Sequence, residues 1–339
     1  MKSYRIPFLF LLISLLGCSS EVKNSITLYT HRHYDTDQVI FEKFTEQTGI
    51  EVKVVKASAD ELIQKMENEG EQSPADLLIT VDAGRLARAK SKDLLQAVES
   101  QVLEETIPDH LQDPDNAWFA LTKRARVIVY DKNSVNPDEL STYEDLKEDK
   151  WKGKLLIRTS DNIYNQSLLA SIIANDGEDE AESWAAGVVE NFAQPPRGND
   201  RDQVKSIAAK EGELAVINTY YLGRMLNSEN PTEVKAGQMV GVFFPNQDGR
   251  GTHINISGIG LAKYAPHKEN AIRFIEYLLS KEVQEMFASS NYEYPVNPEA
   301  ETSETLKSWG EFKEDQLPLS RLGDLNKQAV IIFDKVGWK

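Results

Sequence analysis

Cysteine and basic residues are scarce in this sequence. Among its 339 residues Cys18 is the single cysteine, so no intramolecular disulfide can form. Lys and Arg total 38 against 54 Asp and Glu, and the formal net charge of −16 argues against a nucleic-acid-binding protein. No internal repeat, low-complexity tract or Gly-rich phosphate-binding motif is present, and no nucleophile-base motif such as Gly-x-Ser-x-Gly occurs. The missing catalytic motif argues against an enzyme.

Long apolar runs are also missing, except at the N-terminus. A short basic start precedes a nearly apolar stretch from Ile6 to Leu16, which is typical of a secretory signal and is too short to span a membrane in the mature protein. The following Leu15-Leu16-Gly17-Cys18 resembles the bacterial lipobox. This resemblance implies a signal peptide over residues 1–17, lipid on Cys18 and a lipidated tether over residues 18–25. An ordinary signal peptide with an incidental cysteine remains the alternative.

The rest of the chain has the composition of a soluble globular protein, with 40% hydrophobic and 27% charged residues. At about 150 residues per domain, its length suggests two domains. Apolar patterns predict strands over 25–30, 50–55 and 75–81, with helices over 37–48, from the Ser58 and Glu61 capping box, and over 83–90. Strands that alternate with helices in this way predict a parallel α/β sheet.

Phenols and imidazoles gather where such strands end, which is where ligands bind in parallel sheets. His33 and Tyr34 follow the first strand, Tyr164 lies between a strand over 154–158 and a helix over 166–175, and Tyr220 and Tyr221 follow a buried run. Neighbouring residues of a strand point to opposite faces, so this last pair can reach one point only if the backbone bends. A tyrosine pair is more commonly one core ring and one surface ring.

The alternative is that these five side chains bind a hard cation. A free phenol has a pKa of about 10, so a phenolate ligand at neutral pH requires a cation that favours deprotonation. Ferric iron suits phenolates with one imidazole, whereas calcium and magnesium favour carboxylates and zinc favours thiolate, imidazole or carboxylate. Four phenolates on Fe(III) leave a net charge of about −1, which Arg124 or Arg126 would offset. A surface ion pair explains either arginine equally well.

The order of these motifs resembles the ferric-iron-binding periplasmic proteins of bacterial ABC importers. The likeness runs from about Ile26 to Pro298. It is carried by the stretches around His33-Tyr34, Arg124-Ala125-Arg126 and Asn218-Thr219-Tyr220-Tyr221, with Pro74 to Asp82 and Gly251 to Gly258. The resemblance implies a two-lobed periplasmic-binding-protein fold (type II) with the ligand cleft between the lobes. It assigns His33 and Tyr34 to one lobe, Tyr164, Tyr220 and Tyr221 to the other, and Arg126 to a place near the iron and any synergistic anion.

From this resemblance we expect lobe 1 to comprise residues 26–124 and 250–298, and lobe 2 residues 125–249 and 299–339. The expected function is capture of Fe(III) by a monomeric lipoprotein and its delivery to an iron ABC permease. The protein would lie in the periplasm or on the cell surface and would touch the membrane only through its lipid anchor. A binding protein for an organic cation or oxyanion on the same scaffold is the alternative, and a secreted metalloenzyme with the same donors is a second one.

Overall fold

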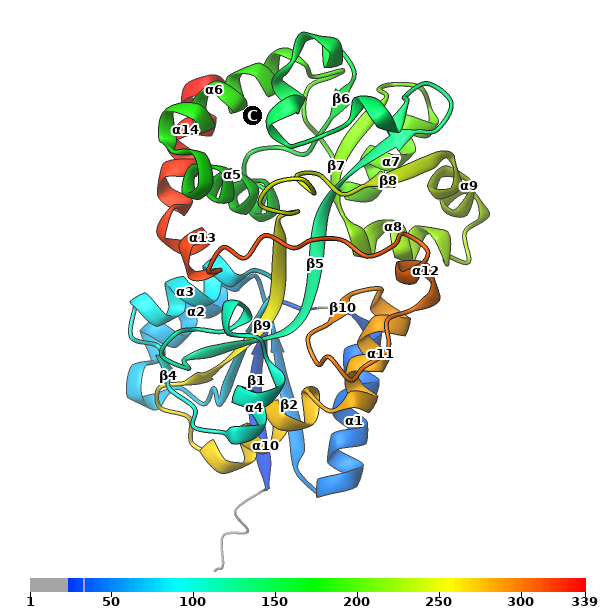
Figure 1. Ribbon diagram of the computed structural model, residues 1–339. Helices are drawn as coiled ribbons and strands as arrows, with labels where there is room; N and C mark the ends of the chain where they lie inside the picture. Colours follow the sequence, from blue (N-terminus) through cyan, green and yellow to red (C-terminus); the bar gives the residue numbers. More distant parts are fainter. Residues whose placement is uncertain (1–23, 33) are drawn as a thin grey trace, which may run out of the picture.

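One long strand, β5 (Trp118–Asp131), runs through both halves of the molecule (Figure 1). Its first half pairs antiparallel with β9 (Ile254–Ala262), and this pairing ends at Ala125 opposite Ile254. From Arg126 onward it pairs antiparallel with β7 (Leu214–Asn218). The strand therefore changes partners at its middle. We call the half that contains β9 the lower lobe and the half that contains β7 the upper lobe.

The computed structural model describes residues 24–32 and 34–339. Ten strands form one sheet with the main order β2-β1-β3-β9-β5-β7-β6, and β10 and β8 pair with β5 while β4 pairs with β9. The β2-β1-β3 part is parallel, as the sequence predicts. The remaining strands are β1 (Ser25–Thr30), β2 (Glu51–Lys56), β3 (Leu77–Thr80), β4 (Leu95–Gln96), β6 (Leu155–Leu156), β8 (Val240–Phe243) and β10 (Tyr294–Pro295).

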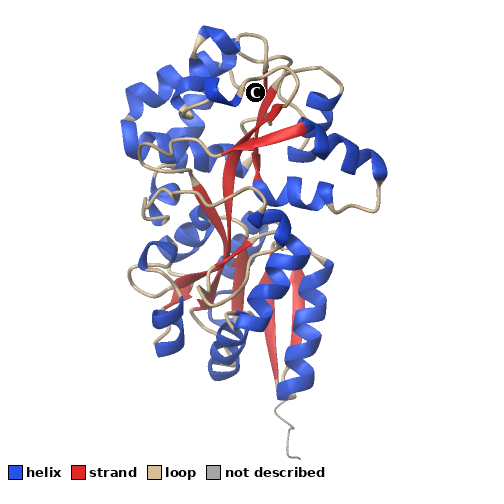
Figure 2. Ribbon diagram, turned by 45° about the vertical axis from the view of Figure 1, so that its right-hand side comes forward, coloured by secondary structure: helices blue, strands red, loops and turns tan. Residues whose placement is uncertain are grey.

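Helices cover the sheet in both lobes (Figure 2). Around the lower lobe lie α1 (Asp35–Thr48), α2 (Ala59–Glu69), α3 (Ala83–Ser91), α4 (Gln101–Thr106), α10 (Lys268–Leu278) and α11 (Lys281–Asn291), and α12 (Glu304–Lys307) lies at the level between α11 and α8. Around the upper lobe lie α5 (Ile163–Asp176), α6 (Glu178–Glu190), α7 (Asp200–Ala208), α8 (Thr219–Leu226), α9 (Pro231–Met239) and α14 (Asn326–Val336), and α13 (Ser320–Asp324) leads into α14. Short 3-10 turns occupy Gly70–Gln72, Asp109–Leu111, Pro137–Glu139, Glu144–Lys147 and Asp149–Trp151. Over the described ranges, no helix combines the length and the apolar character needed to cross a membrane.

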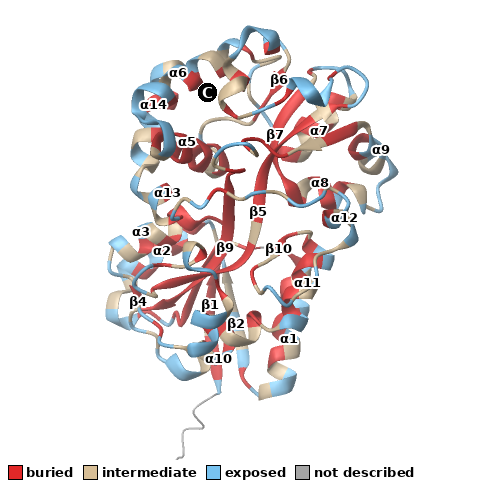
Figure 3. Cartoon of the chain, in the orientation of Figure 1, coloured by how far each residue is buried: buried red, intermediate tan, exposed pale blue. Residues whose placement is uncertain are grey.

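Each lobe has its own aromatic core, and the buried faces of the helices turn inward onto the strands (Figure 3). In the lower lobe Phe41 and Phe44 of α1 meet Phe274 of α10 edge-to-face, at centroid distances of 5.4 and 4.9 Å. In the upper lobe Trp338 packs on Trp184 of α6 and Phe333 of α14. These rings help to hold the helices against the sheet, because each buried aromatic side chain removes a large apolar area from water.

Several local predictions are confirmed, and two are wrong in detail. Gly49 ends α1 in the left-handed conformation with φ 71°, and Ser58 and Glu61 form the capping box of α2. The strand expected over 154–158 shrinks to the two residues of β6. The buried run before Tyr220 ends at Asn218 and turns directly into α8, so both phenols of the pair belong to a helix.

A third crossing between the lobes follows α12. Residues 312–319 run in front of β5 (Figure 1) and are fastened to the turn before β9, where Thr252 N donates to Lys313 O at 2.8 Å and Asp315 N donates to Thr252 O at 3.0 Å. We call these residues the strap. The two strands β5 and β9 and the strap together join the lobes.

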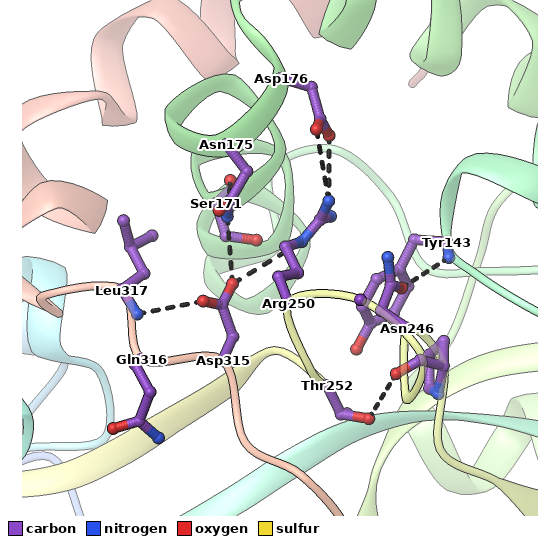
Figure 4. Close-up of polar contacts among 12 residues, drawn as sticks. Tyr143, Ser171, Asn175, Asp176, Asn246, Arg250, Thr252, Asp315, Gln316 and Leu317 are labelled. Carbon is purple, nitrogen blue, oxygen red and sulfur yellow. Dashed lines mark hydrogen bonds and ion pairs between the residues drawn. The ribbon is translucent and has the colours of Figure 1, made fainter.

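Arg250 ties the strap to the upper lobe (Figure 4). Its guanidinium lies 2.5 Å from Glu144, 3.1 Å from Asp176 and 3.7 Å from Asp315 of the strap. Asn175 of α5 also donates to Asp315 at 3.0 Å. Burial raises the pKa of the Asp176 and Asp315 carboxyls above the ordinary range, while Arg250 opposes that rise. One cation thus holds three carboxylates together.

Removal of this cation tests the arrangement. We expect Arg250→Gln to lower the free energy of unfolding at pH 7.5 by about 2 kcal/mol, because three carboxylates are left facing one another. The pKa values of Asp176 and Asp315 rise further in the variant. A carboxyl whose pKa is raised in the folded state costs stability as pH increases through that pKa, so the deficit should shrink at pH 5. Urea unfolding at both pH values measures it, with Arg250→Lys as the control that keeps the charge. Equal deficits at the two pH values would contradict this account.

Candidate functional site

Tyr34 lies between β1 and α1 at the cleft side of the lower lobe. Its backbone is extended, with φ −86° and ψ 141°, at the residue that precedes α1. The phenol is buried, and the guanidinium of Arg32 lies 4.8 Å from its ring centroid. Arg32 is itself held by buried ion pairs with Asp37 and Glu293, each at 3.0 Å. These ion pairs fix the position of the Arg32 guanidinium that contacts the Tyr34 ring. The neighbouring His33, expected as a ligand, is outside the described residues.

Tyr164 and Tyr220 meet in the upper lobe although 56 residues separate them. Each is the second residue of a helix, α5 and α8 respectively. The side chain of Asn162 caps α5 by accepting from Tyr164 N at 3.1 Å. The two phenol oxygens are 3.1 Å apart. The structure therefore brings two of the predicted donors into direct contact.

Tyr221 completes the upper-lobe group. Its ring stacks on that of Tyr220 with centroids 4.2 Å apart and planes 30° apart. Successive residues of a helix point about 100° apart instead of to opposite faces, so the turn from β7 into α8 supplies the bend that the sequence requires. Tyr34 reaches the same place from the lower lobe, because its ring meets that of Tyr220 edge-on at 6.3 Å. Four tyrosines from two lobes thus form one group, which we call the phenol cluster.

Three arginines surround the ring of Tyr164. The guanidinium carbons of Arg124, Arg126 and Arg158 lie 5.5, 5.9 and 5.6 Å from its centroid. Two of them share one carboxylate, since Arg126 and Arg158 pair with the fully buried Asp200 at 3.1 and 3.2 Å. The described residues around the phenol cluster therefore carry a positive excess.

Arg126 and Arg124 differ in their partners. Arg126 bonds to Asn218 and Asn165 in addition to Asp200. Arg124 donates through Nη2 to the carbonyl of Val81, while its Nε and Nη1 atoms are buried without a hydrogen-bond partner among the described residues. No carboxylate in the described part of the chain pairs with it. The role of Arg126 as the charge beside the ligand, implied by the family resemblance, stays a prediction. Only the Nε atom of Arg126 lacks a partner among the described residues, whereas Arg124 has two such atoms.

Burial decides the protonation of the phenols. It is the largest cause of the raised pKa of Tyr34, Tyr164 and Tyr220, and neighbouring tyrosines raise the pKa of each further. Arg124 acts in the opposite direction on Tyr164 and Tyr220. These phenols are neutral at pH 7 in the ligand-free protein. A ligand that binds phenolate must therefore displace their protons.

A cavity of about 420 Å³ opens beside the phenol cluster between the lobes. Side chains of both lobes line it, namely His31, Ser58, Asp60, Arg85, Arg158, Thr159, Asp161, Asn162, Tyr164 and Tyr221, with Ala59 and Ile163. Arg158 was not predicted from the sequence. It follows β6, and its place at the end of a strand is the signal that could have identified it. Within the described ranges, no group of three or more His, Cys, Asp or Glu side chains is arranged to hold a metal, so the phenols are the prominent donors.

Two lobes joined by crossing segments, with converging polar groups between them, define a two-lobed binding protein of the type II periplasmic fold. The family comparison agrees. Residues 40–314 match the model of the bacterial extracellular solute-binding proteins, and the chain belongs to this family.

Named relatives extend the comparison. The chain is 48% identical to iron uptake protein A1 of Synechocystis over 317 residues, which cover 94% of this chain and 88% of that protein. A solved Trichodesmium structure in complex with iron and citrate ligands has 51% identity and a TM-score of 0.90, over 93% of this chain and all of the other. A ferric binding protein from Campylobacter jejuni has 48% identity and a TM-score of 0.89, with coverage of 93% and 100%.

The different partners of the two β5 arginines predict different stabilities. We expect Arg126→Met to lower the free energy of unfolding by about 3 kcal/mol, because it leaves the buried Asp200 with less compensating charge. Arg124→Met should change it by less than about 1 kcal/mol, since no ion pair is broken. Urea unfolding of the ligand-free variants measures both. An equal cost for the two substitutions would contradict the assignment of Arg126 to the fold.

Proposed function

We propose that this protein captures Fe(III) between its two lobes and delivers it to the permease of an iron ABC importer. The phenolates of Tyr34, Tyr164, Tyr220 and Tyr221 would bind the ion, with His33 as a fifth ligand. The observation that carries the proposal is the convergence of the four phenols. The names of the relatives at 44–51% identity support iron as the cargo.

The donor set favours a trivalent ion. Phenolate oxygen is a hard ligand, and displacement of protons from buried phenols of raised pKa requires a strong Lewis acid. Four phenolates and Fe(III) carry a net charge of about −1, which the positive excess around Tyr164 offsets. The Arg124 guanidinium, with two donor atoms free of other partners, is the group that we expect to respond most to the bound ion. Room for a synergistic anion exists in the adjacent cavity, next to Arg158.

Capture would proceed by closure of the lobes. Tyr164, Tyr220 and Tyr221 belong to the upper lobe and already touch one another, so the ion meets a preassembled group there first. Tyr34 and His33 then join from the lower lobe. The ion interacts with more ligands in the closed form and therefore shifts the population toward it. Protons compete with iron for the phenolates, so acid favours release.

The same proposal includes a division of the chain into signal peptide, tether and two lobes. Residues 1–17 would be the signal peptide and Cys18 would carry lipid. The tether that holds a periplasmic or surface-exposed monomer to the membrane, expected over 18–25, would end before Ser25, which belongs to β1. Lobe 1 would comprise 26–124 and 250–298, and lobe 2 would comprise 125–249 and 299–339. The partner change of β5 between Ala125 and Arg126 supports the first of these boundaries.

The alternatives have less support. An organic cation would be disfavoured by the three arginine guanidiniums around the ring of Tyr164, and the buried Asp200 beside them is already paired with two arginines. The relatives that carry the family assignment are binding proteins, which favours a binding role over a catalytic one. We therefore place this protein among solute-binding proteins and not among metalloenzymes.

Replacement of single phenols tests the proposal. We expect apoprotein to develop a visible charge-transfer band on addition of Fe(III), and Tyr164→Phe, Tyr220→Phe and Tyr221→Phe each to weaken the band. Changes to groups that only support a ligand cost about 10- to 100-fold in metal affinity, so loss of a phenolate should cost more than about 100-fold. Tyr264→Phe is the matched control, because Tyr264 is 42% exposed and lies in the turn before α10, outside the phenol cluster. Absence of a band in the unmodified protein would rule out the ferric function.

The role of Arg124 has its own test. We expect Arg124→Gln to weaken Fe(III) binding about 10-fold, because a buried positive charge near the phenolates is lost. Arg124→Lys should recover part of the affinity. Competition with a chelator at fixed pH measures the affinity, and unfolding of each apoprotein controls for stability. Unchanged affinity in the Gln variant would show that the charge at 124 does not act on the ion.

A further inference from the structure

The helix that carries the tyrosine pair also makes a close contact with the other lobe. One turn after Tyr220, residue Gly223 of α8 lies against Tyr292, which directly follows α11 of the lower lobe. A Cβ atom built on Gly223 would lie 2.5 Å from the Cβ of Tyr292 and 2.8 Å from its Cγ. The Cβ of Tyr292 is fixed by the backbone, so a rotamer change cannot move it away. The contact requires glycine on the α8 side.

The lower-lobe side of this contact is rigidly held. Tyr292 adopts the left-handed conformation with φ 57°, which is uncommon for a bulky residue and persists only where its surroundings enforce it. The next residue, Glu293, is buried and accepts hydrogen bonds from Arg32 at 3.0 and 3.3 Å, from Thr122 at 2.9 Å and from Ser257 at 3.2 Å. Tyr294 then pairs with β5 in β10. The turn at Tyr292 therefore cannot easily retreat from α8.

The position of the contact links it to the phenol cluster. Residues three and four apart share a helix face, so Gly223 and Arg224 continue the face of Tyr220. The Arg224 guanidinium lies 5.2 Å from the ring centroid of Tyr34. At the end of the helix, Asn227 donates to Thr305 at 3.0 Å. The contact at Gly223 thus lies on the same helix face as the phenol of Tyr220, next to an arginine that reaches Tyr34 of the lower lobe.

We infer that the contact between Gly223 and Tyr292 is the stop against which the lobes close, and that glycine at this position lets α8 come close enough for Tyr34 to join the other phenols. Gly223 is a positioning residue, because it touches no part of the cargo. The inference rests on the proposed ferric function. It adds that the completeness of closure, and with it the residence time of the ion, is set at a contact that includes none of the ligand atoms.

The test uses Gly223→Ala in the otherwise unchanged chain. The upper-lobe phenols remain, so the variant should still show an iron band. Iron should leave to a competing chelator about 10-fold faster or more, because overpacked contacts are relieved by separation of the lobes. The radius of gyration of the iron-loaded variant, measured by small-angle X-ray scattering, should exceed that of the iron-loaded parent.

A second substitution separates this mechanism from simple misfolding. Tyr292→Gly removes the side chain that the new methyl group meets and also suits the positive φ. The double variant Gly223→Ala/Tyr292→Gly should therefore regain slower release and a smaller radius than Gly223→Ala alone. Tyr292→Phe, which keeps the ring, and Gly249→Ala, whose new Cβ would meet its nearest atom at an ordinary 3.7 Å, should both behave like the parent.

The outcomes distinguish the two proposals. If the parent protein shows no iron band, the ferric function fails. If the parent binds iron but Gly223→Ala releases it at the parental rate with an unchanged radius, the closing stop is wrong. Failure of Tyr292→Gly to reverse the effect of Gly223→Ala would also overturn it, because the defect would then lie in α8 itself.

Discussion

Everything at the cleft depends on the short contact between the hydroxyls of Tyr164 and Tyr220. Two oxygens 3.1 Å apart can share a hydrogen bond while they are neutral. They cannot both ionise at that distance in a buried site unless a cation lies between or beside them. Burial and neighbouring phenols raise the pKa of each, so both stay neutral in the ligand-free protein. The site therefore distinguishes cations by their power to displace protons.

The arginines around the cluster fall into two groups, those that pair with the buried carboxylate of Asp200 and one that does not. Asp200 takes both Arg126 and Arg158, and the asparagines on either side occupy more of the donors of Arg126. Among the described residues, Arg124 donates a hydrogen bond only to a backbone carbonyl. Its charge is available to whatever develops negative charge at Tyr164. The two arginines are two residues apart on one strand, yet Arg126 is bonded to Asp200 and two asparagines, whereas two donor atoms of Arg124 lack a partner among the described residues.

Much of this arrangement could be predicted from the sequence. The parallel β2-β1-β3 unit follows from apolar periodicity, and the caps at Ser58 and Gly49 follow from local turn chemistry. The convergence of Tyr34, Tyr164 and Tyr220 could be expected because each follows a strand. The distinction between Arg124 and Arg126 could not, since it depends on Asp200, which is 74 residues from Arg126 and on another element. Neither could the contact at Gly223, because a glycine inside a helix carries no signal about which distant residue approaches it.

The partner change in β5 has a mechanical consequence. A strand that is hydrogen-bonded to β9 below Ala125 and to β7 above it can flex least within either lobe and most at the junction. A rotation of the lobes would then have its axis close to Arg124 and Arg126. Side chains near an axis move little during the rotation. The guanidinium groups of Arg124 and Arg126 would thus move little while the lobes rotate. An ion that enters the open form would already meet these two charges close to the positions that they hold in the closed form.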